Sequence, residues 1–281
     1  MDKHTALKQY FGHSAFRFGQ EEIIDRILAG GDCLAVMPTG AGKSMCYQIP
    51  ALVLSGVTIV ISPLISLMKD QVEALAQSGV PAAYINSSLQ PHEYYTTLRL
   101  LSTGEIKILY VAPERLLSDD FLALCQTLEI PLVAVDEAHC VSHWGQDFRP
   151  SYLKIAPFVN ALPTRPVLAA FTATATEAVK RDIVNILGLN APYSITTGFD
   201  RQNLYFEIRS CTAREKDALL LNILRGAGGK SSIVYCSTRK NVEQVCAFLK
   251  LNGLNAAMYH AGLKDELRRQ AQDDFILTAV I

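Results

Sequence analysis

The sequence predicts an α/β fold, a parallel sheet covered on both faces by helices. Between about residues 32 and 200, short β-branched apolar runs alternate with helical patterns, which is typical of βαβ units. The 281 residues are 49% hydrophobic, enough for a sizeable core. Charged residues make up only 19% and Gly and Pro contents are ordinary, which excludes a disordered or fibrous protein.

The strands of this sheet are expected where β-branched apolar runs are bounded by turns, at residues 32–37, 57–62, 82–86, 107–112, 132–136 and 167–171. Between them lie helical patterns, of which residues 64–77 give the clearest example. Its apolar face would hold Leu64, Leu67, Met68, Val72 and Leu75, and its polar face Lys69, Asp70, Glu73 and Gln77. This segment is predicted to be a surface helix packed on the sheet.

After a polar connection at residues 198–203, a second α/β pattern begins. Strands are expected at residues 205–209, 232–236 and 256–260, with a turn at 226–230, and residues 276–281 have the pattern of a strand that is beginning. We therefore expect one domain over residues 1–204 and part of another over residues 205–281.

The overall charge gives no general signature of nucleic-acid binding. Lys and Arg total 26 against 27 Asp and Glu, for a formal net charge of -1. Any nucleic-acid partner must therefore be bound through local sites.

Cysteine usage and the absence of targeting signals indicate a reducing compartment. The seven cysteines are odd in number and none forms a C-x-x-C pair, which argues against a disulfide framework or a zinc site. The N-terminus lacks a signal-peptide pattern, and no apolar run approaches the roughly 18 residues of a membrane helix. We expect a soluble cytoplasmic protein with no membrane partner, associated with the nucleoid if it is bacterial.

A glycine-rich segment between a strand and a helix predicts a phosphate-binding loop. Gly40 and Gly42 would turn backbone N–H groups toward phosphate oxygens, Lys43 would neutralise the β- and γ-phosphates, and the Ser44 hydroxyl would reach Mg²⁺. The strict pattern has a glycine where Met37 stands, and a glycine turn that caps a helix is the alternative. The expected ATP-binding residues here are Met37, Pro38, Thr39, Gly40, Ala41, Gly42, Lys43 and Ser44.

A buried strand that ends in Asp136-Glu137-Ala138-His139 predicts the catalytic acids. The carboxyl ends of parallel strands share one edge, so these acids would lie near Lys43. Asp136 can hold Mg²⁺, and Glu137 can orient and deprotonate the attacking water. An isolated Asp-Glu pair is more often a solvated strand end, but the phosphate loop upstream favours the catalytic interpretation, with Lys43, Asp136, Glu137 and His139 as catalytic residues.

These residues carry a family resemblance. The Gly-x-Gly-Lys-Ser and Asp-Glu-Ala-His segments look like those of a superfamily 2 helicase of DEAH-box type. Residues near the N-terminus resemble the adenine-reading motif of RecQ DNA helicases: Leu7, Phe11, Phe16, Arg17 and residues 20–24. That motif usually has proline where Phe18 stands, and the resemblance implies adenine contacts from Arg17 and Gln20. For this segment alone, a helix start with a capping Gln20 is the alternative.

Residues 138–152 resemble the aromatic-rich loop that engages single-stranded DNA in RecQ enzymes. Aromatic faces stack on bases without sequence preference, so Trp144 and Phe148 are candidate DNA contacts, and Arg149 can add phosphate or stacking contacts. Gln146 stands where many family members have His. The alternative is that Trp144, Phe148 and Tyr152 belong to the core.

Further segments resemble family motifs. Residues 62–71, with Ser62 and Lys69, and residues 112–116 resemble DNA-backbone-contacting motifs, although Ser62 could equally begin a helix and Lys69 be solvated. Residues 172–176, with Thr172 and Thr174, resemble the motif that links ATP state to DNA movement; a capping box of Thr174 and Glu177 is the structural alternative. In the second unit, residues 235–239 and 259–263 match the opening elements of the second motor domain.

The resemblance implies two RecA-like domains and an ATP-dependent 3'-5' DNA helicase, an ATP hydrolase that unwinds duplexes in DNA repair and recombination. ATP and Mg²⁺ are the implied cofactors, and single-stranded, branched or partial-duplex DNA the implied partner. The family's γ-phosphate-contacting arginines are expected beyond residue 281, so this N-terminal piece should bind ATP–Mg²⁺ and DNA but unwind little. The alternatives are an RNA-directed ATPase of the same superfamily and a catalytically silent nucleotide- or DNA-binding fragment.

Overall fold

The computed structural model describes residues 1–145, 147–198, 204–212, 214–228 and 230–277. The chain divides into two compact units, Met1–Arg201 and Gln202–Ile281. Gln146, residues 199–203 of the polar connection, Gly229 of the turn and residues 278–281 of the last expected strand lie outside the described residues.

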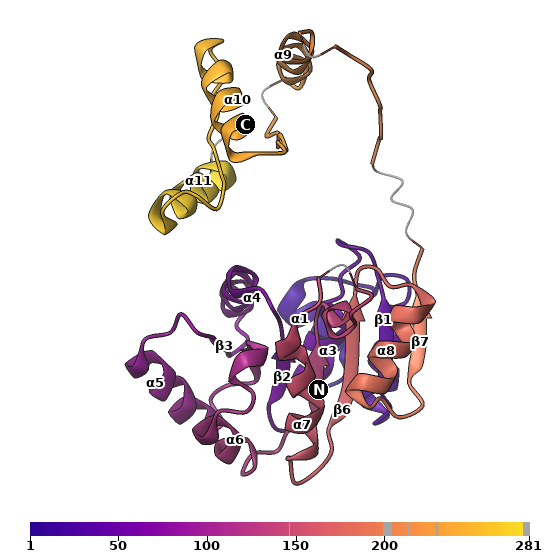
Figure 1. The fold of residues 1–281 in the computed structure, drawn as a ribbon. Helices are drawn as coiled ribbons and strands as arrows, with labels where there is room; N and C mark the ends of the chain where they lie inside the picture. The colour runs from indigo at the N-terminus through magenta and orange to yellow at the C-terminus, as the bar shows by residue number, and fades with distance from the viewer. Residues whose placement is uncertain (146, 199–203, 213, 229, 278–281) are drawn as a thin grey trace. The chain divides into compact units, whose positions relative to one another are not determined.

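The first unit is built on a parallel sheet of seven strands in the order β3-β4-β2-β5-β6-β1-β7 (Figure 1). Every neighbouring pair is parallel, as the sequence predicted. The strands are β1 (Cys33–Val36), β2 (Thr58–Ile61), β3 (Ala82–Ile85), β4 (Ile108–Val111), β5 (Leu132–Val135), β6 (Val167–Thr172) and β7 (Tyr193–Thr196). Only β7 was not predicted, because this edge strand is mostly exposed and lacks a buried apolar run.

Helices cover both faces of this sheet, which confirms the predicted layers. One face carries α2 (Gln20–Leu28), α3 (Met45–Val53) and α4 (Ile65–Gln77), with α1 (Lys3–Phe11) packed beside α2 and α3. The other carries α5 (Pro91–Ser102), α6 (Asp119–Cys125), α7 (Ile155–Asn160) and α8 (Glu177–Leu187). Three short 3₁₀ turns follow strands or precede helices: η1 (Pro113–Arg115), η2 (Ala138–Val141) and η3 (Pro150–Lys154).

The strands divide their side chains between two cores. In β1, Leu34 joins the core under α5–α8, whereas Cys33 and Ala35 join the core under α2–α4. This alternation follows from the period of two in a strand, and every residue of β1 is buried because the sheet is covered on both faces.

Helix α4 forms where the periodicity predicts it, with Met68 and Leu75 buried. Leu64 differs from the prediction: it precedes the helix with extended φ and ψ of -109° and 106° and is 43% exposed. A residue outside the helix cannot share its apolar face.

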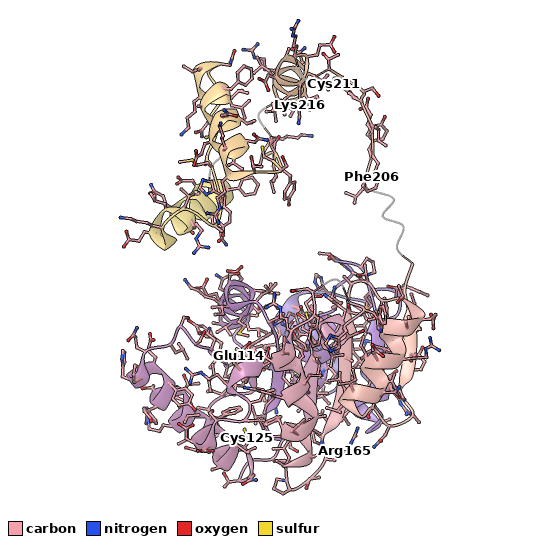
Figure 2. The ribbon with its side chains drawn as sticks, viewed as in Figure 1. Glu114, Cys125, Arg165, Phe206, Cys211 and Lys216 are labelled. Atoms are coloured by element: carbon pink, nitrogen blue, oxygen red, sulfur yellow. The ribbon has the colours of Figure 1, made fainter. Side chains whose placement is uncertain are left out.

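In the second unit the structure forms α9 (Lys216–Gly226), α10 (Arg239–Leu251) and α11 (Asp265–Leu277) around a small core of Leu224, Cys246, Leu249 and Ala256. The strands predicted at residues 205–209, 232–236 and 256–260 are wrong, because none of these segments forms a strand ladder. Ile276 and Leu277 end α11 and so do not begin a strand. Residues 204–210 are an extended exposed segment in which Phe206 is 84% exposed (Figure 2). Among the described residues, no helix combines the length and apolar character needed to span a membrane.

A buried carboxylate joins the amino-terminal ends of three strands. Asp32 is 3% exposed and accepts two hydrogen bonds from the Arg165 guanidinium, at 3.1 and 2.6 Å. It also accepts from the backbone N–H groups of Leu168 in β6, at 2.9 Å, and of Asn190 before β7, at 2.6 Å. Asp32 thereby ties β1, β6 and the start of β7 together.

Replacing Asp32 with Asn should lower the free energy of unfolding of the first unit by about 2–3 kcal/mol, because Arg165 loses its ionic partner and one buried N–H loses an acceptor. Chemical denaturation followed by circular dichroism measures the change. The control is Glu73→Gln, which breaks only the exposed 3.6 Å ion pair with Lys69 and should cost at most about 0.5 kcal/mol. Equal stability of both variants would contradict this role of Asp32.

Candidate active site

The predicted site residues gather at the carboxyl edge of the sheet. The phosphate loop follows β1, Asp136 follows β5, and Thr172 is the last residue of β6. Two backbone hydrogen bonds extend the ladder beyond the strand ends, Met37 N–H to Thr172 O at 2.9 Å and Asp136 N–H to Ile61 O at 2.9 Å. The glycine loop and the acids are therefore fixed to one edge, as the sequence predicted.

The phosphate loop is a compact turn between β1 and α3. Gly40 and Gly42 both have φ of 84°, a left-handed conformation that favours glycine. A Cβ on Gly42 would lie 2.4 Å from Gln20 Nε2, so any larger residue at this position would displace the Gln20 side chain. Lys43 Nζ donates to Met37 O at 3.1 Å across the loop, which places its charge at the loop mouth.

Among the remaining loop residues, Thr39 is exposed, and Pro38, Ala41 and Ser44 are half-buried. Met37 is fully buried, and its sulfur lies 4.0 Å from Cys46 Sγ beneath the loop. The prediction that Met37 binds ATP therefore needs correction for its side chain, which fills the core; only its backbone faces the loop. This packing explains why a large residue is tolerated where the strict motif has glycine.

Arg17 and Gln20 hold the phosphate loop directly. Arg17 Nη1 donates to Gly40 O at 2.6 Å, and Gln20 Nε2 donates to Gly42 O at 3.0 Å and to Ala41 O at 3.3 Å. Gln20 Oε1 accepts from Arg17 N–H at 2.8 Å, and α2 has no side-chain cap. The capping alternative for Gln20 is therefore wrong. The sequence did not predict contacts from these residues to the loop backbone.

Asp136 is a buried acid with a perturbed charge state. Burial, reinforced by the neighbouring Glu137 carboxylate, raises its pKa from 3.8 to about 6, and the positive charge of Lys43 offsets part of this rise. One carboxylate oxygen accepts from Glu137 N–H at 3.0 Å. Glu137 itself has φ of 47° and ψ of 44°, a strained conformation for a residue with a Cβ. Strain of this kind is concentrated at functional sites.

The residues at this edge fit a divalent cation. A buried carboxylate whose pKa is raised favours a nearby positive charge, and carboxylate and hydroxyl oxygens are the ligands that Mg²⁺ prefers. Ser44 immediately precedes α3 and supplies the hydroxyl, and Asp136 supplies the carboxylate. These two residues would hold the ion.

His139 connects the acids to the end of β6. The Thr172 hydroxyl forms hydrogen bonds with Thr174 O at 3.1 Å and with His139 Nδ1 at 2.9 Å. The same nitrogen lies 3.3 Å from Glu137 Oε2. His139 therefore bridges Glu137 and Thr172.

Two threonines of residues 172–176 differ in their environment. Thr172 is fully buried, so it can couple elements but cannot touch DNA directly in this conformation, whereas Thr174 is exposed. The capping box predicted for Thr174 and Glu177 is wrong, because Thr176 caps α8 and its hydroxyl accepts from Val179 N–H at 3.3 Å. Thr174 is therefore not engaged in capping that helix.

The aromatic-rich segment splits between surface and core. Trp144 is 79% exposed, and half-buried Phe148 stacks on the exposed His143 ring with centroids 3.7 Å apart. Tyr152 is fully buried and donates to Asp136 O at 2.8 Å. The core alternative is thus right for Tyr152 and wrong for Trp144. The sequence missed the role of Tyr152 in holding the acid-bearing turn.

Polar side chains anchor this segment to two other elements. The buried Ser142 hydroxyl donates to Asp182 of α8 at 2.6 Å and accepts from Trp144 N–H at 3.1 Å. Arg149 donates to Pro63 O at 3.0 Å and to Asp147 Oδ2 at 2.7 and 2.9 Å. These bonds use three of the five N–H donors of the guanidinium, which leaves donors for a nucleic-acid phosphate.

The two candidate DNA-contacting residues that follow β2, Ser62 and Lys69, differ in solvent exposure. Ser62 is 1% exposed, and its hydroxyl has no hydrogen-bond partner among the described residues. It cannot reach a DNA backbone from this position, contrary to the expectation. Lys69 is exposed on α4 and forms a 3.6 Å ion pair with Glu73, so its amine is accessible.

A further buried amide, missed by the sequence reasoning, connects three elements next to the phosphate loop. Gln48 of α3 is 5% exposed, and its Nε2 donates to Gln71 Oε1 of α4 and to the Tyr110 hydroxyl of β4, both at 3.1 Å. Gln48 lies in the otherwise largely apolar helix α3, and a buried amide requires hydrogen-bond partners. This pattern in the sequence could have predicted its contacts.

Three cavities within the described part of the chain lie away from these residues. A cavity of about 350 Å³ is lined by Cys125 and Arg165 (Figure 2) and by residues just before β5 and β6, at the opposite edge of the sheet. Two cavities of about 450 and 820 Å³ are lined by residues of the second unit.

Comparisons with known proteins agree with this geometry. The family model of the DEAD/DEAH box helicase matches residues 17–182, more than half of the chain. ATP-dependent DNA helicase RecQ of Bacillus subtilis is 45% identical over 273 residues, covering 97% of this chain and 46% of the relative. The corresponding protein of Pasteurella multocida is 44% identical over 277 residues, covering 97% and 43%. The chain thus spans less than half the length of these relatives.

Among solved structures, the DUF1998 helicase MrfA bound to DNA matches with a TM-score of 0.72 at 16% identity, covering 98% of this chain and 42% of that one. The DEAD-box helicase Mss116 bound to single-stranded RNA also matches with a TM-score of 0.72 at 16% identity, covering 99% and 62%. At this level of identity, both similarities establish the fold alone.

The raised pKa of Asp136 predicts a pH-dependent stability difference. The folded state holds the proton more tightly than the unfolded state, so ionisation costs stability as the pH rises from 3.8 through about 6. Without divalent cations, Asp136→Asn should therefore be more stable than the parent chain at pH 7.5, by roughly 2–3 kcal/mol. The difference should shrink as the pH is lowered below 6. Denaturation in EDTA at several pH values measures it, and a pH-independent difference would contradict the prediction.

Proposed function

Because the chain belongs to the DEAD/DEAH box helicase family, we propose that its first unit binds and hydrolyses ATP as a motor domain of a RecQ-type DNA helicase. In this proposal, residues 1–204 form the ATP-binding RecA-like domain and residues 205–281 belong to a second RecA-like domain. The observation that carries it is the joining of Lys43, the Asp136–Glu137 pair and the His139–Thr172 bridge at one edge of the sheet.

Each residue at this edge has a role that its contacts support. Phosphates entering the loop would replace the Met37 carbonyl as the partner of Lys43, whose charge offsets theirs. Glu137 orients the attacking water and accepts its proton, while water attacks the γ-phosphorus and ADP leaves. Ser44 and Asp136 would hold Mg²⁺, which when bound would supply positive charge to offset that of the phosphates.

Nucleotide state would reach the nucleic-acid segment through direct hydrogen bonds. Glu137 faces His139, which binds Thr172, and Tyr152 ties the aromatic-rich segment to the backbone of Asp136. We place the DNA contacts at Trp144, Phe148, Arg149, Lys69 and Thr174, with Thr172 in the coupling path and Ser62 dependent on a rearrangement.

The finer parts of the proposal rest on the resemblance of the sequence motifs to those of RecQ helicases. These are translocation in the 3'-5' direction, action on branched or partial-duplex DNA, and a role in DNA repair and recombination. For the 281-residue polypeptide by itself we propose ATP–Mg²⁺ and DNA binding with little unwinding. Robust ATP-dependent strand displacement by this polypeptide would contradict that expectation.

A second candidate function is an RNA-directed ATPase, because the structural neighbour Mss116 is bound to single-stranded RNA. The fold does not separate the two. The exposed Trp144 favours a single-stranded ligand of either kind, and direct competition between DNA and RNA decides between them.

Removing the Lys43 amine should weaken ATP binding. The Lys43→Ala variant loses charge-assisted hydrogen bonds to phosphate, so its Kd for a fluorescent ATP analogue should rise roughly 10- to 100-fold. Lys8→Ala, on the exposed side of α1, is the matched control and should bind as the parent chain does. Unchanged affinity in Lys43→Ala would show that the glycine loop is not the nucleotide site.

The single tryptophan of the chain, Trp144, provides a direct probe of nucleic-acid binding. Addition of oligo(dT) should quench its fluorescence, because bases stack on the exposed indole. Phe148→Ala should weaken oligo(dT) binding about 5-fold or more, since a stacking surface is worth roughly 1–3 kcal/mol. Tyr95→Ala, an exposed aromatic on α5, should bind normally.

The same titration separates the candidate functions. Tighter quenching by oligo(rU) than by oligo(dT) would support the RNA-directed ATPase. Absence of quenching by either would exclude Trp144 as a nucleic-acid contact.

A further inference from the structure

Gln48 joins the phosphate loop to a second helix through both its backbone and its side chain. Its N–H donates to Ser44 O at 2.9 Å, in the first turn of α3. Gln48 is only 5% exposed, and its Nε2 donates to Gln71 Oε1 of α4 and to the Tyr110 hydroxyl of β4, both at 3.1 Å. The last residue of the phosphate loop is therefore linked to α4 by two successive hydrogen bonds.

The hydrogen bond between Gln48 and Gln71 adds direction to a contact that is otherwise apolar in character. Helix α4 also packs through Met68 and Leu75, which lie in the same apolar cluster as Tyr47 of α3. Apolar packing is not directional, whereas a buried hydrogen bond requires a defined distance and angle between its partners. The bond therefore holds α4 at one position relative to the helix of the phosphate loop.

Two buried tyrosines extend this connection toward the acids. Tyr47 and Tyr110 are each 1% exposed, and their rings meet edge to face with centroids 6.5 Å apart. Burial raises the pKa of Tyr110 to about 12, hydrogen bonds with Gln48 and Tyr47 oppose the rise, and the Asp136 carboxylate adds to it. Gln48 thus belongs to a buried polar cluster that also interacts electrostatically with Asp136.

Helix α4 and the residues just before it support two of the proposed nucleic-acid contacts. Lys69 is exposed on α4, two residues before Gln71. Arg149 donates to Pro63 O at 3.0 Å, two residues before the helix begins at Ile65. A displacement of α4 would therefore move the Lys69 amine and the carbonyl that holds Arg149.

We propose that Gln48 is a positioning residue that couples nucleotide binding at the glycine loop to nucleic-acid binding at α4. Phosphates in the loop would shift Ser44 and the first turn of α3, and the hydrogen bond from Gln48 to Gln71 would move α4 with it. This connection includes neither His139 nor Thr172, so it is separate from the one through the end of β6. The proposal rests on the proposed function of the first unit and adds the residues that link its two ligands.

The test measures how far nucleotide changes the affinity for single-stranded DNA. Trp144 fluorescence gives the Kd of oligo(dT) on the 281-residue chain, without nucleotide and with saturating Mg²⁺ and a non-hydrolysable ATP analogue. In the parent chain the two Kd values should differ by about 5-fold or more, as is usual for coupled sites. Gln48→Met and Gln71→Met each remove one partner of the bond and keep an unbranched side chain, so the ratio should fall below about 2-fold.

A purely structural role of the bond predicts a different result. Each variant would then melt at a lower temperature, but nucleotide would change the oligo(dT) affinity by the same factor as in the parent chain, which would overturn the proposal. Gln71→Glu keeps an acceptor for Gln48 Nε2. It should therefore keep the parent's ratio, although its negative charge weakens oligo(dT) binding in both states. Loss of the ratio in Gln71→Glu would contradict the hydrogen bond as the cause of coupling.

The matched control is Gln126→Met, which removes an amide that donates to Ala161 O at 3.1 Å, away from α3 and α4, and should leave the ratio unchanged. If Gln48→Met does not fold, Gln71→Met decides, because Gln71 is only half-buried. A parent chain that binds both ligands with no effect of one on the other would overturn the proposal and leave the proposed function intact. A parent chain that binds neither ligand would overturn both.

Discussion

The site depends on backbone hydrogen bonds that continue the sheet beyond its strands. Met37 N–H binds Thr172 O and Asp136 N–H binds Ile61 O, so the first residues after β1 and β5 remain in register with β6 and β2. Parallel connectivity delivers all of these segments to the same edge. The glycine loop and the acids are therefore held in place by a sheet that is buried on both faces.

Side chains from other elements also donate hydrogen bonds to carbonyl groups of these loops. Gln20 binds Gly42 O, Tyr152 binds Asp136 O, and Arg149 binds Pro63 O. Each donor comes from a different element than its acceptor, so these bonds connect separate parts of the first unit. The same bonds give a physical route by which a change at the nucleotide site alters the aromatic-rich segment.

In the second unit, segments with a strand-like sequence do not form a hydrogen-bonded strand ladder. Ile208, Ile233 and Tyr235 lie in segments with strand-like sequence, yet they are 98%, 63% and 92% exposed and their segments form no ladder. A strand is stabilised by hydrogen bonds to neighbours and by helices on its faces, so its pattern alone does not form it. Exposed apolar side chains of this kind favour association with other proteins. A catalytically silent fragment that binds nucleotide or DNA therefore remains an alternative function for the isolated polypeptide.

By itself, the sequence determined the α/β class, the parallel sheet from β1 to β6, and the position of the glycine loop and acids at its edge. These features are encoded by local period and turn chemistry, as the positive φ of Gly40 and Gly42 illustrates. Only the tertiary structure decided that Met37 packs into the core, that Thr176 rather than Thr174 caps α8, and that β7 completes the sheet. It also decided that His139 meets Thr172 across 33 residues and Arg149 meets Pro63 across 86. Such pairings depend on how whole elements pack, which no local pattern specifies.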